Sequence, residues 1–263
     1  MESITVENLS FGYADSDKLI LQDVEMHINE GDFVCLLGQS GCGKSTFLRL
    51  MAGLETPTSG RICVDGVPIS GTSLDRSMVF QDYGLFPWMT AGENILLALR
   101  ERFPKKSKAE CREIAKQALL DVGLKEEVYS QFPKALSGGM KQRCAIARSF
   151  SMNPSILLMD EPFGALDAVT RARLQDMVLS LWSHETQKKT VFFVTHDVEE
   201  ALLLGTRILV FGQSPSHVIF EKEIPLEMKP DRKQMYESRF IMDLRNELVE
   251  YINQDVWSHV GDN

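Results

Sequence analysis

The chain has 263 residues, of which 44% are hydrophobic and 25% charged, the composition of a globular protein large enough for one core with a satellite subdomain. Its 28 basic and 37 acidic residues give a net charge of -9, which disfavours a broad nucleic-acid surface because such a surface must neutralise phosphates. No apolar run reaches the roughly 18 residues of a membrane span, so we expect no span. The N-terminal residues lack the pattern of a secretory signal.

Five cysteines, an odd number without any C-x-x-C pair, predict reduced thiols in a cytosolic compartment rather than disulfides or a zinc site. No internal repeat or low-complexity tract interrupts the chain.

The first third of the chain predicts strands with one helix. Two segments alternate apolar and polar residues and predict half-exposed antiparallel strands, whereas DFVCLLG is an apolar run typical of a buried parallel strand. The expected elements are strands at 3–10, about 20–29, 32–38, 60–66 and 76–81, and a helix at 43–53.

The remainder predicts helices over 91–152 and then alternating strands and helices. In the helix expected at 168–185, one face carries Val169, Leu174, Met177, Val178 and Leu181, which we expect to pack into the core. Further strands are expected at 155–162, 190–196, 207–212 and 217–224, followed by a terminal amphipathic helix around Tyr236, Phe240, Leu244 and Leu248. Packing is the favoured role of that last helix, and contact with a partner is the alternative.

The sequence GQSGCGKS, residues 38–45, matches the phosphate-loop pattern G-x-x-x-x-G-K-[ST] between a predicted strand and a predicted helix. Its backbone N–H groups are expected to surround a phosphate at a helix N-terminus, with Lys44 reaching the β and γ oxygens and Ser45 ligating Mg²⁺. Cys42 is interpreted as a side chain small enough to fit the loop, with an activated thiolate as the alternative. The expected nucleotide-binding residues here are Gly38, Gln39, Ser40, Gly41, Cys42, Gly43, Lys44, Ser45 and Thr46.

Two carboxylates follow the apolar run ILLM at the end of a predicted strand. Asp160 suits Mg²⁺ binding, and Glu161 suits orienting a water molecule and accepting its proton. His196, at the end of the next expected strand, could sense a γ-phosphate and hold the catalytic geometry. In isolation such residues are more often structural, but downstream of a phosphate loop the functional interpretation is favoured.

The segment LSGGMKQR contains no catalytic set of side chains. A serine and two glycines before a helix would leave backbone N–H groups unpaired, which describes an anion site. A phosphate-loop kinase or GTPase would leave this segment and His196 without a role.

Taken together, these motifs resemble the ATP-binding subunit of ABC transporters over nearly the whole chain. The resemblance implies an α/β phosphate-loop ATPase of the ABC type, with an antiparallel β subdomain and a helical subdomain. It makes LSGGM the family signature, Gln81 the Q-loop glutamine and a further Mg²⁺ ligand, GALD with Asp167 the D-loop, His196 the switch histidine, and Tyr13 the residue that stacks on adenine. It also implies that Ser137, Gly138 and Gly139 face ATP bound to another subunit, in a head-to-tail dimer.

The same resemblance implies an organisation and partners. The core and antiparallel subdomain would occupy residues 1–87 and 153–225, the helical subdomain 88–152, and a C-terminal helical extension 226–263. The partners would be two transmembrane permease subunits, a second ATPase subunit of the same or a related kind, and an extracytoplasmic solute-binding protein, with no nucleic acid. The chain would lie peripherally on the cytoplasmic face of the inner membrane.

Three finer expectations concern the resemblance. Met140 replaces the glutamine that usually completes the signature, and we expect little effect if backbone amides and Ser137 make the main contacts. The aromatic segment 82–90 would dock a permease helix, or else Phe86 and Trp88 would fill a join between subdomains. The residues FPWMT after Gln81, the compact length and LSGGM-x-QR together resemble the nitrate, sulfonate and taurine importer branch, whose relatives also take up bicarbonate or thiamine precursors. The alternatives are an ABC-type ATPase of another importer branch and, less favoured, a nucleic-acid-linked ABC ATPase.

Overall fold

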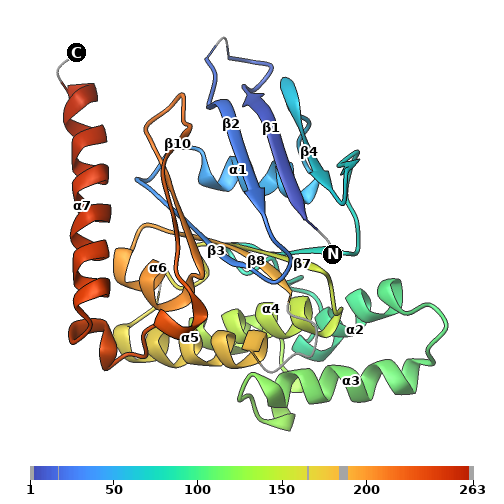
Figure 1. The fold of residues 1–263 in the computed structure, drawn as a ribbon. Helices are drawn as coiled ribbons and strands as arrows, with labels where there is room; N and C mark the ends of the chain where they lie inside the picture. The colour runs from blue at the N-terminus through green and yellow to red at the C-terminus, as the bar shows by residue number, and fades with distance from the viewer. Residues whose placement is uncertain (1–2, 17, 165, 184–188, 261–263) are drawn as a thin grey trace. The chain divides into compact units, whose positions relative to one another are not determined.

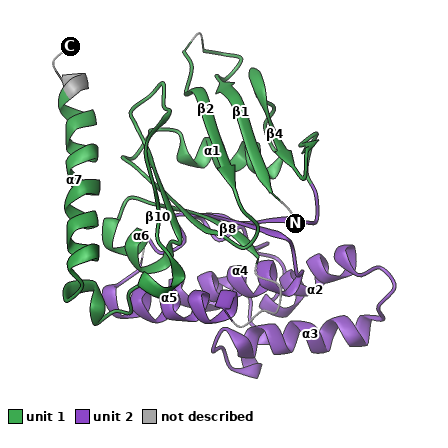
Figure 2. Ribbon diagram, viewed as in Figure 1, with its two compact units in different colours: residues 1–72, 187–263 green, residues 73–186 purple. Residues whose placement is uncertain are grey.

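The computed structural model of the chain describes residues 3–16, 18–164, 166–183 and 189–260. They form two compact units. Unit 1 combines residues 1–72 with 187–263, and unit 2 is the continuous segment 73–186 (Figure 2). The expected division into functional subdomains follows different boundaries and stays a prediction.

Unit 1 contains an antiparallel sheet built on the first strand. In the order β2-β1-β4-β5, Ile4 of β1 lies opposite Ile28 of β2 and Val64 of β4. Val24, Met26 and Ile28 alternate with exposed residues and are buried, as their spacing predicts, and Leu21 is buried on the other side of a register shift. The strands are β1 (Ile4–Phe11), β2 (Leu21–Ile28), β4 (Ser59–Val64) and β5 (Val67–Pro68) (Figure 1).

The parallel strands of unit 1 position the phosphate loop. β3 pairs in parallel with both β8 and β9, and β10 pairs antiparallel with β9. All residues of β3, β8 and β9 are buried, which agrees with their continuous apolar runs. Phe47 of α1 packs against this sheet, with its ring centroid 6.2 Å from that of Phe192 and 5.6 Å from that of Phe211. These elements are β3 (Phe33–Leu37), α1 (Lys44–Ala52), β8 (Thr190–Thr195), β9 (Arg207–Phe211) and β10 (Val218–Glu223).

The C-terminal part of unit 1 is helical and runs beside β10 (Figure 1). Ile241, Leu244 and Leu248 of α7 are buried, so the expected packing face is confirmed for Leu244 and Leu248. Tyr236 does not belong to that helix: it lies in a short 3-10 turn, is 67% exposed, and donates its hydroxyl to Glu199 Oε2 at 2.9 Å. The elements are α6 (Val198–Leu204), two 3-10 turns (Leu226–Met228 and Gln234–Tyr236) and α7 (Arg239–Val260).

The described residues of unit 2 form a parallel strand pair and four α-helices. β6 pairs with β7 so that Met78 lies opposite Leu158. Thr90 and Ser107 begin α2 and α3 with capping boxes, each closed by a glutamate three residues later. The elements are β6 (Arg76–Val79), α2 (Ala91–Arg102), α3 (Lys108–Asp121), 3-10 turns at Glu126–Ser130 and Pro133–Ala135, α4 (Gly138–Ser151), β7 (Ile156–Asp160) and α5 (Ala168–Ser183).

The apolar face predicted for α5 is only partly correct. Leu174 and Val178 are buried, but Val169 is 63% exposed, and Met177 and Leu181 line a groove at the surface of unit 2. Residues 184 and 185 of the predicted helix lie outside the described residues. Among the helices that the structure describes, none combines the length and the apolar character needed to cross a membrane.

Candidate nucleotide-binding site

The phosphate loop in unit 1 follows β3 and ends at the first residue of α1. Gly41 and Gly43 have φ angles of +85° and +101°, which glycine adopts without steric cost. A Cβ on Gly38 would lie 2.6 Å from the carbonyl oxygen of Phe211, so a side chain would clash with the backbone there. Because the N-cap of α1 is Gly43, the cap residue has no side chain that could occupy the N–H groups of the first turn.

Lys44 lies inside this loop and is only 4% exposed. Its ammonium group donates to the carbonyl oxygens of Gly38 at 2.8 Å and Gln39 at 2.7 Å. The charge is therefore held at the centre of the curled backbone. Gln39, Ser40 and Gly41 form the exposed tip of the loop, Ser45 is half-buried, and Thr46 is buried.

Cys42 is buried in the same loop, with its sulfur 3.6 Å from Lys44 Nζ. Burial raises the pKa of this thiol, and the nearby Lys44 ammonium only partly opposes the effect. The thiol is therefore neutral at physiological pH, which favours its interpretation as a small packing side chain over an activated thiolate.

Two other candidate residues of unit 1 lie at strand ends. Tyr13 follows β1 and packs edge-on against Phe11, with ring centroids 5.0 Å apart and planes at 82°. His196 is exposed directly after β8, and the next residue, Asp197, caps α6 by accepting hydrogen bonds from the N–H groups of Glu199 and Glu200. The cap fixes the start of α6 beside the histidine.

Unit 2 carries the two consecutive carboxylates. Asp160 is the last residue of β7 and is 7% exposed, while Glu161 is half-buried. Glu161 has a φ of +42°, a conformation that costs a non-glycine residue on the order of 1 kcal/mol or more. Its carbonyl oxygen accepts a hydrogen bond from Gly164 N at 3.3 Å, so a tight turn holds this backbone where the strand ends. Strain of this kind is typical of functional positions.

The signature segment begins a helix, as its sequence predicts. Ser137 is the N-cap of α4, and its Oγ accepts a hydrogen bond from Met140 N at 3.3 Å. Ser137 and Gly138 are exposed, so the hydroxyl and the first-turn amides face the surface of this unit. The contribution of Met140 to this cap is its backbone N–H.

Three motifs converge around these glycines in unit 2. A Cβ on Gly138 would lie 3.2 Å from the hydroxyl oxygen of Tyr83, two residues after Gln81. A Cβ on Gly139 would lie 2.9 Å from Thr170 Cγ2. Thr170 in turn hydrogen-bonds Asp167 and lowers the pKa of that carboxyl group. The segment after Gln81, the signature and the D-loop turn are thus neighbours; Ala165 of the GALD motif lies outside the described residues.

Sequence reasoning missed two residues that hold the segment after Gln81. Arg148 of α4 donates to the carbonyl oxygen of Gly84 at 2.6 Å. Asn94 is 1% exposed, accepts from Phe86 N at 2.7 Å, and donates to three carbonyl oxygens of residues 86–90. The available signal in the sequence was an asparagine on the apolar face of α2, because a buried amide needs hydrogen-bond partners. Gln81 itself is exposed.

For a metal, the motifs offer the hydroxyl oxygen of Ser45 in unit 1 and the oxygens of Gln81 and Asp160 in unit 2. Hydroxyl, amide and carboxylate oxygens fit Mg²⁺, which keeps several waters and needs few protein ligands. Accordingly, no cluster of three or more His, Cys, Asp or Glu residues that could hold a metal occurs in the described part of the chain.

Comparison with known proteins places the chain in a family. Residues 21–164 match the ABC transporter family. The chain is 42% identical over 233 residues to the nitrate import ATP-binding protein NrtD of Synechococcus elongatus, covering 88% of this chain and 84% of the relative. It is 40% identical over 252 residues to the bicarbonate transport ATP-binding protein CmpD of Synechocystis sp., covering 95% and 88%.

Solved structures agree with this assignment. The dimeric bacterial ABC transporter cassette MJ0796 is 33% identical, with a TM-score of 0.75 over 84% of this chain and 98% of that chain. A second structure of the same cassette, in a dimeric post-hydrolysis state bound to ADP and Pi, gives the same values. The fold, the motifs and these relatives show that the chain belongs to the ABC transporter family, as an ATP-binding subunit that hydrolyses ATP.

Proposed function

We propose that the chain energises the import of a small anion, nitrate or bicarbonate, by hydrolysing ATP at the cytoplasmic face of the inner membrane. The names of NrtD and CmpD support this cargo class, and both alignments span most of the two chains. Sulfonates and taurine belong to the same proposed branch and serve as competing cargoes in a test.

The observation that carries this proposal is the loop around Lys44. Its glycines allow the backbone to curl, Lys44 is buried at its centre, and α1 begins without a capping side chain. Successive N–H groups, a cation and a helix N-terminus suit the β and γ phosphates of ATP. Tyr13 would stack on the adenine ring.

The hydrolytic roles fall to residues that the motifs single out. Ser45, Gln81 and Asp160 would hold Mg²⁺, which when bound neutralises charge on the phosphates. Glu161 would orient the attacking water and accept its proton, and His196 would contact the γ-phosphate.

The exposed first turn of α4 is proposed to act on a second subunit. Ser137 and the amides of Gly138 and Gly139 would bind the γ-phosphate of ATP held by the partner, and Asp167 would lie at the same interface. ATP would then add contacts that neither subunit makes alone and close the dimer, and loss of phosphate would reopen it. The dimeric state of the MJ0796 cassette supports this arrangement.

The segment 82–90 is proposed to receive a permease helix. Trp88 is 68% exposed and Phe86 lies beside it, with ring centroids 5.4 Å apart. Asn94 and Arg148 fix the backbone of this segment, so a docked helix would move a rigid surface. This exposure favours docking over filling a join between subdomains. The complex would contain two permease subunits, and an extracytoplasmic solute-binding protein would deliver the cargo.

The test uses Glu161→Gln in the complex with the two permease subunits, reconstituted in vesicles. We expect ATP to bind, ATP hydrolysis and uptake of labelled nitrate or bicarbonate to stop, and closed ATPase dimers to accumulate. Glu25→Gln, which alters an exposed carboxylate of β2, is the matched control. Undiminished uptake by the Glu161 variant would contradict the assigned chemistry, and exclusive uptake of taurine or a sulfonate by the unmodified complex would contradict the cargo.

A further inference from the structure

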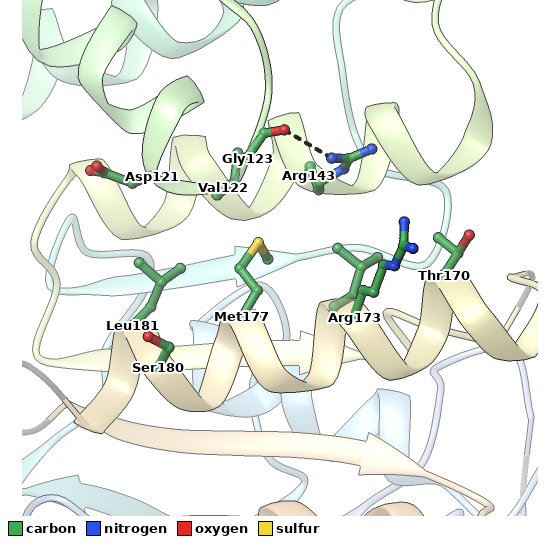
Figure 3. A pocket seen from close by; sticks show the side chains of 10 residues that line it. Asp121, Val122, Gly123, Arg143, Thr170, Arg173, Met177, Ser180 and Leu181 are labelled. Carbon is green, nitrogen blue, oxygen red and sulfur yellow. Dashed lines mark hydrogen bonds between the residues drawn. The ribbon is translucent and has the colours of Figure 1, made fainter.

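Unit 2 contains a groove of about 400 Å³ that none of the proposed nucleotide contacts uses. One wall is α5 from Thr170 to Leu181, and the other is formed by Asp121–Gly123 and Arg143 (Figure 3). The α5 wall spans about 16 Å at 1.5 Å per residue, so the groove extends well beyond the D-loop turn. Its volume lies within the range of sites for small organic molecules.

The two ends of this groove differ in charge. Arg143 and Arg173 lie at one end, and in Figure 3 the Arg173 side chain rises from α5 toward the wall that carries Arg143. No hydrogen bond or ion pair joins Arg173 to any residue that the structure describes, and Asp121 lies at the opposite end, where it accepts a hydrogen bond from Gln117. Two guanidinium groups therefore share one end of the groove, whereas the carboxylate of its lining, Asp121, lies at the other end.

The surface between the two ends is apolar. Met177 rises into the groove between the charged ends, and Leu181 lies farther from the arginines (Figure 3). Leu174 and Val122, both buried, complete this lining. A ligand that filled the groove would gain from covering the exposed parts of Met177 and Leu181.

We propose that this groove binds an organic carboxylate with a short apolar chain. The carboxylate would lie between Arg143 and Arg173, since a planar guanidinium matches a carboxylate with two parallel hydrogen bonds. The apolar chain of the ligand would lie along Met177 toward Leu181. An inorganic anion would satisfy the arginines alone and leave the apolar lining uncovered, so the apolar chain is part of the recognition.

Occupancy of the groove would reach the signature helix. Arg143 donates from Nε to the carbonyl oxygen of Gly139 at 3.3 Å and from Nη1 to that of Gly123 at 3.1 Å. A carboxylate competes for these donors and would weaken the hold on the first turn of α4. We therefore expect the ligand to lower ATP hydrolysis; this consequence rests on the proposed role of Gly139, whereas the binding does not.

Binding is tested with octanoate on the whole chain carrying ¹³C-methyl methionine. We expect octanoate to shift the Met177 methyl resonance, assigned with Met177→Leu, in a saturable manner. Octanamide and acetate should leave the resonance in place, because octanamide lacks the carboxylate and acetate lacks the apolar chain. Arg173→Gln should weaken octanoate binding about tenfold, the usual effect of one charged hydrogen-bonding partner. Leu181→Asp should abolish octanoate binding by placing a negative charge beside the apolar chain of the ligand.

The matched control is Arg100→Gln, which removes an exposed arginine of α2 outside the groove. Equal binding of octanoate and octanamide, or equal weakening by the Arg173 and Arg100 variants, would overturn the proposal. If octanoate binds as expected but ATP hydrolysis by the unmodified protein is unchanged at saturation, the link to α4 is wrong. A failure of ATP hydrolysis without octanoate would instead refute the proposed function.

Discussion

Replacing Ser137 separates its cap of α4 from its proposed contact with a phosphate, because the two require different chemistry. Ser137→Ala removes the acceptor of Met140 N and should lower the free energy of unfolding by about 1 kcal/mol. For a chain of this size that corresponds to a fall of about 2–4 °C in Tm. Ser137→Asp retains a good capping acceptor at the N-terminus of α4 and should leave Tm unchanged or slightly higher.

The aspartate variant should nevertheless fail in ATP hydrolysis. A carboxylate about 4 Å from the partner's γ-phosphate repels it by about 4 kcal/mol at a surface dielectric constant near 20. That energy corresponds to a rate about a thousandfold lower. The binding of ATP to the chain's own phosphate loop should be unchanged, because the proposed contact of Ser137 is with ATP of the partner.

Three measurements check this reasoning: thermal unfolding, binding of a fluorescent ATP analogue to dilute protein, and the ATPase rate as a function of protein concentration. The expected pattern is a stable Ser137→Asp protein that binds nucleotide normally and hydrolyses it about a thousandfold more slowly than the unmodified protein at every protein concentration. An aspartate variant that hydrolysed ATP within tenfold of the unmodified rate would refute the placement of α4 against a phosphate.

Three further substitutions test neighbouring features. Met140→Gln should change the ATPase rate by less than tenfold in a steady-state assay, because the residue contributes its backbone N–H to the cap; a larger change would show that the side chain matters. Glu161→Gly should abolish ATP hydrolysis and raise the free energy of unfolding by about 0.5–1 kcal/mol, because glycine relieves the strain at φ +42°. The free energy is measured by denaturant titration, and an unchanged or lower value would show that the backbone of Glu161 is not strained. Asn94→Asp can still accept from Phe86 N but cannot donate to the three carbonyl oxygens, so the free energy of unfolding should fall by about 1–3 kcal/mol. Hydrogen exchange of the amides of residues 86–90 should accelerate. Exchange protection equal to that of the unmodified chain would show that Asn94 does not hold this segment.

The sequence predicted the features that depend on local pattern. Continuous apolar runs identified β3, β7 and β8, and the order Ser-Gly-Gly identified the start of α4. It failed where exposure depends on distant residues. Val169 fits the apolar period of α5 but is exposed, and Tyr236 lies in a 3-10 turn before α7, where its hydroxyl bonds Glu199, 37 residues earlier. Periodicity along one helix contains no information on which neighbour covers each turn.

The site shows the same limit. The phosphate-loop pattern identified Lys44 and its glycines, because each conformational requirement is met by a residue within the loop. The support for segment 82–90 was not predictable in this way, since Arg148 reaches Gly84 across 64 positions of the chain. An arginine beside buried positions of a helix is equally compatible with an ion pair or with a charged end that reaches solvent, so the sequence alone does not indicate its backbone partner.

The two helix N-termini assigned to phosphate are specified by different means, and this difference governs which substitutions each tolerates. Gly43 begins α1 at φ +101°, and a Cβ there would lie 2.9 Å from the side chains of Ile20 and Leu21. Any side chain at position 43 therefore disturbs the backbone that forms the loop. Ser137 begins α4 with an extended backbone that many residues adopt, so position 137 is constrained by the chemistry of its side chain. Changes at Gly43 should thus impair nucleotide binding through the shape of the loop, whereas changes at Ser137 can remove hydrolysis from a chain that folds and binds ATP normally.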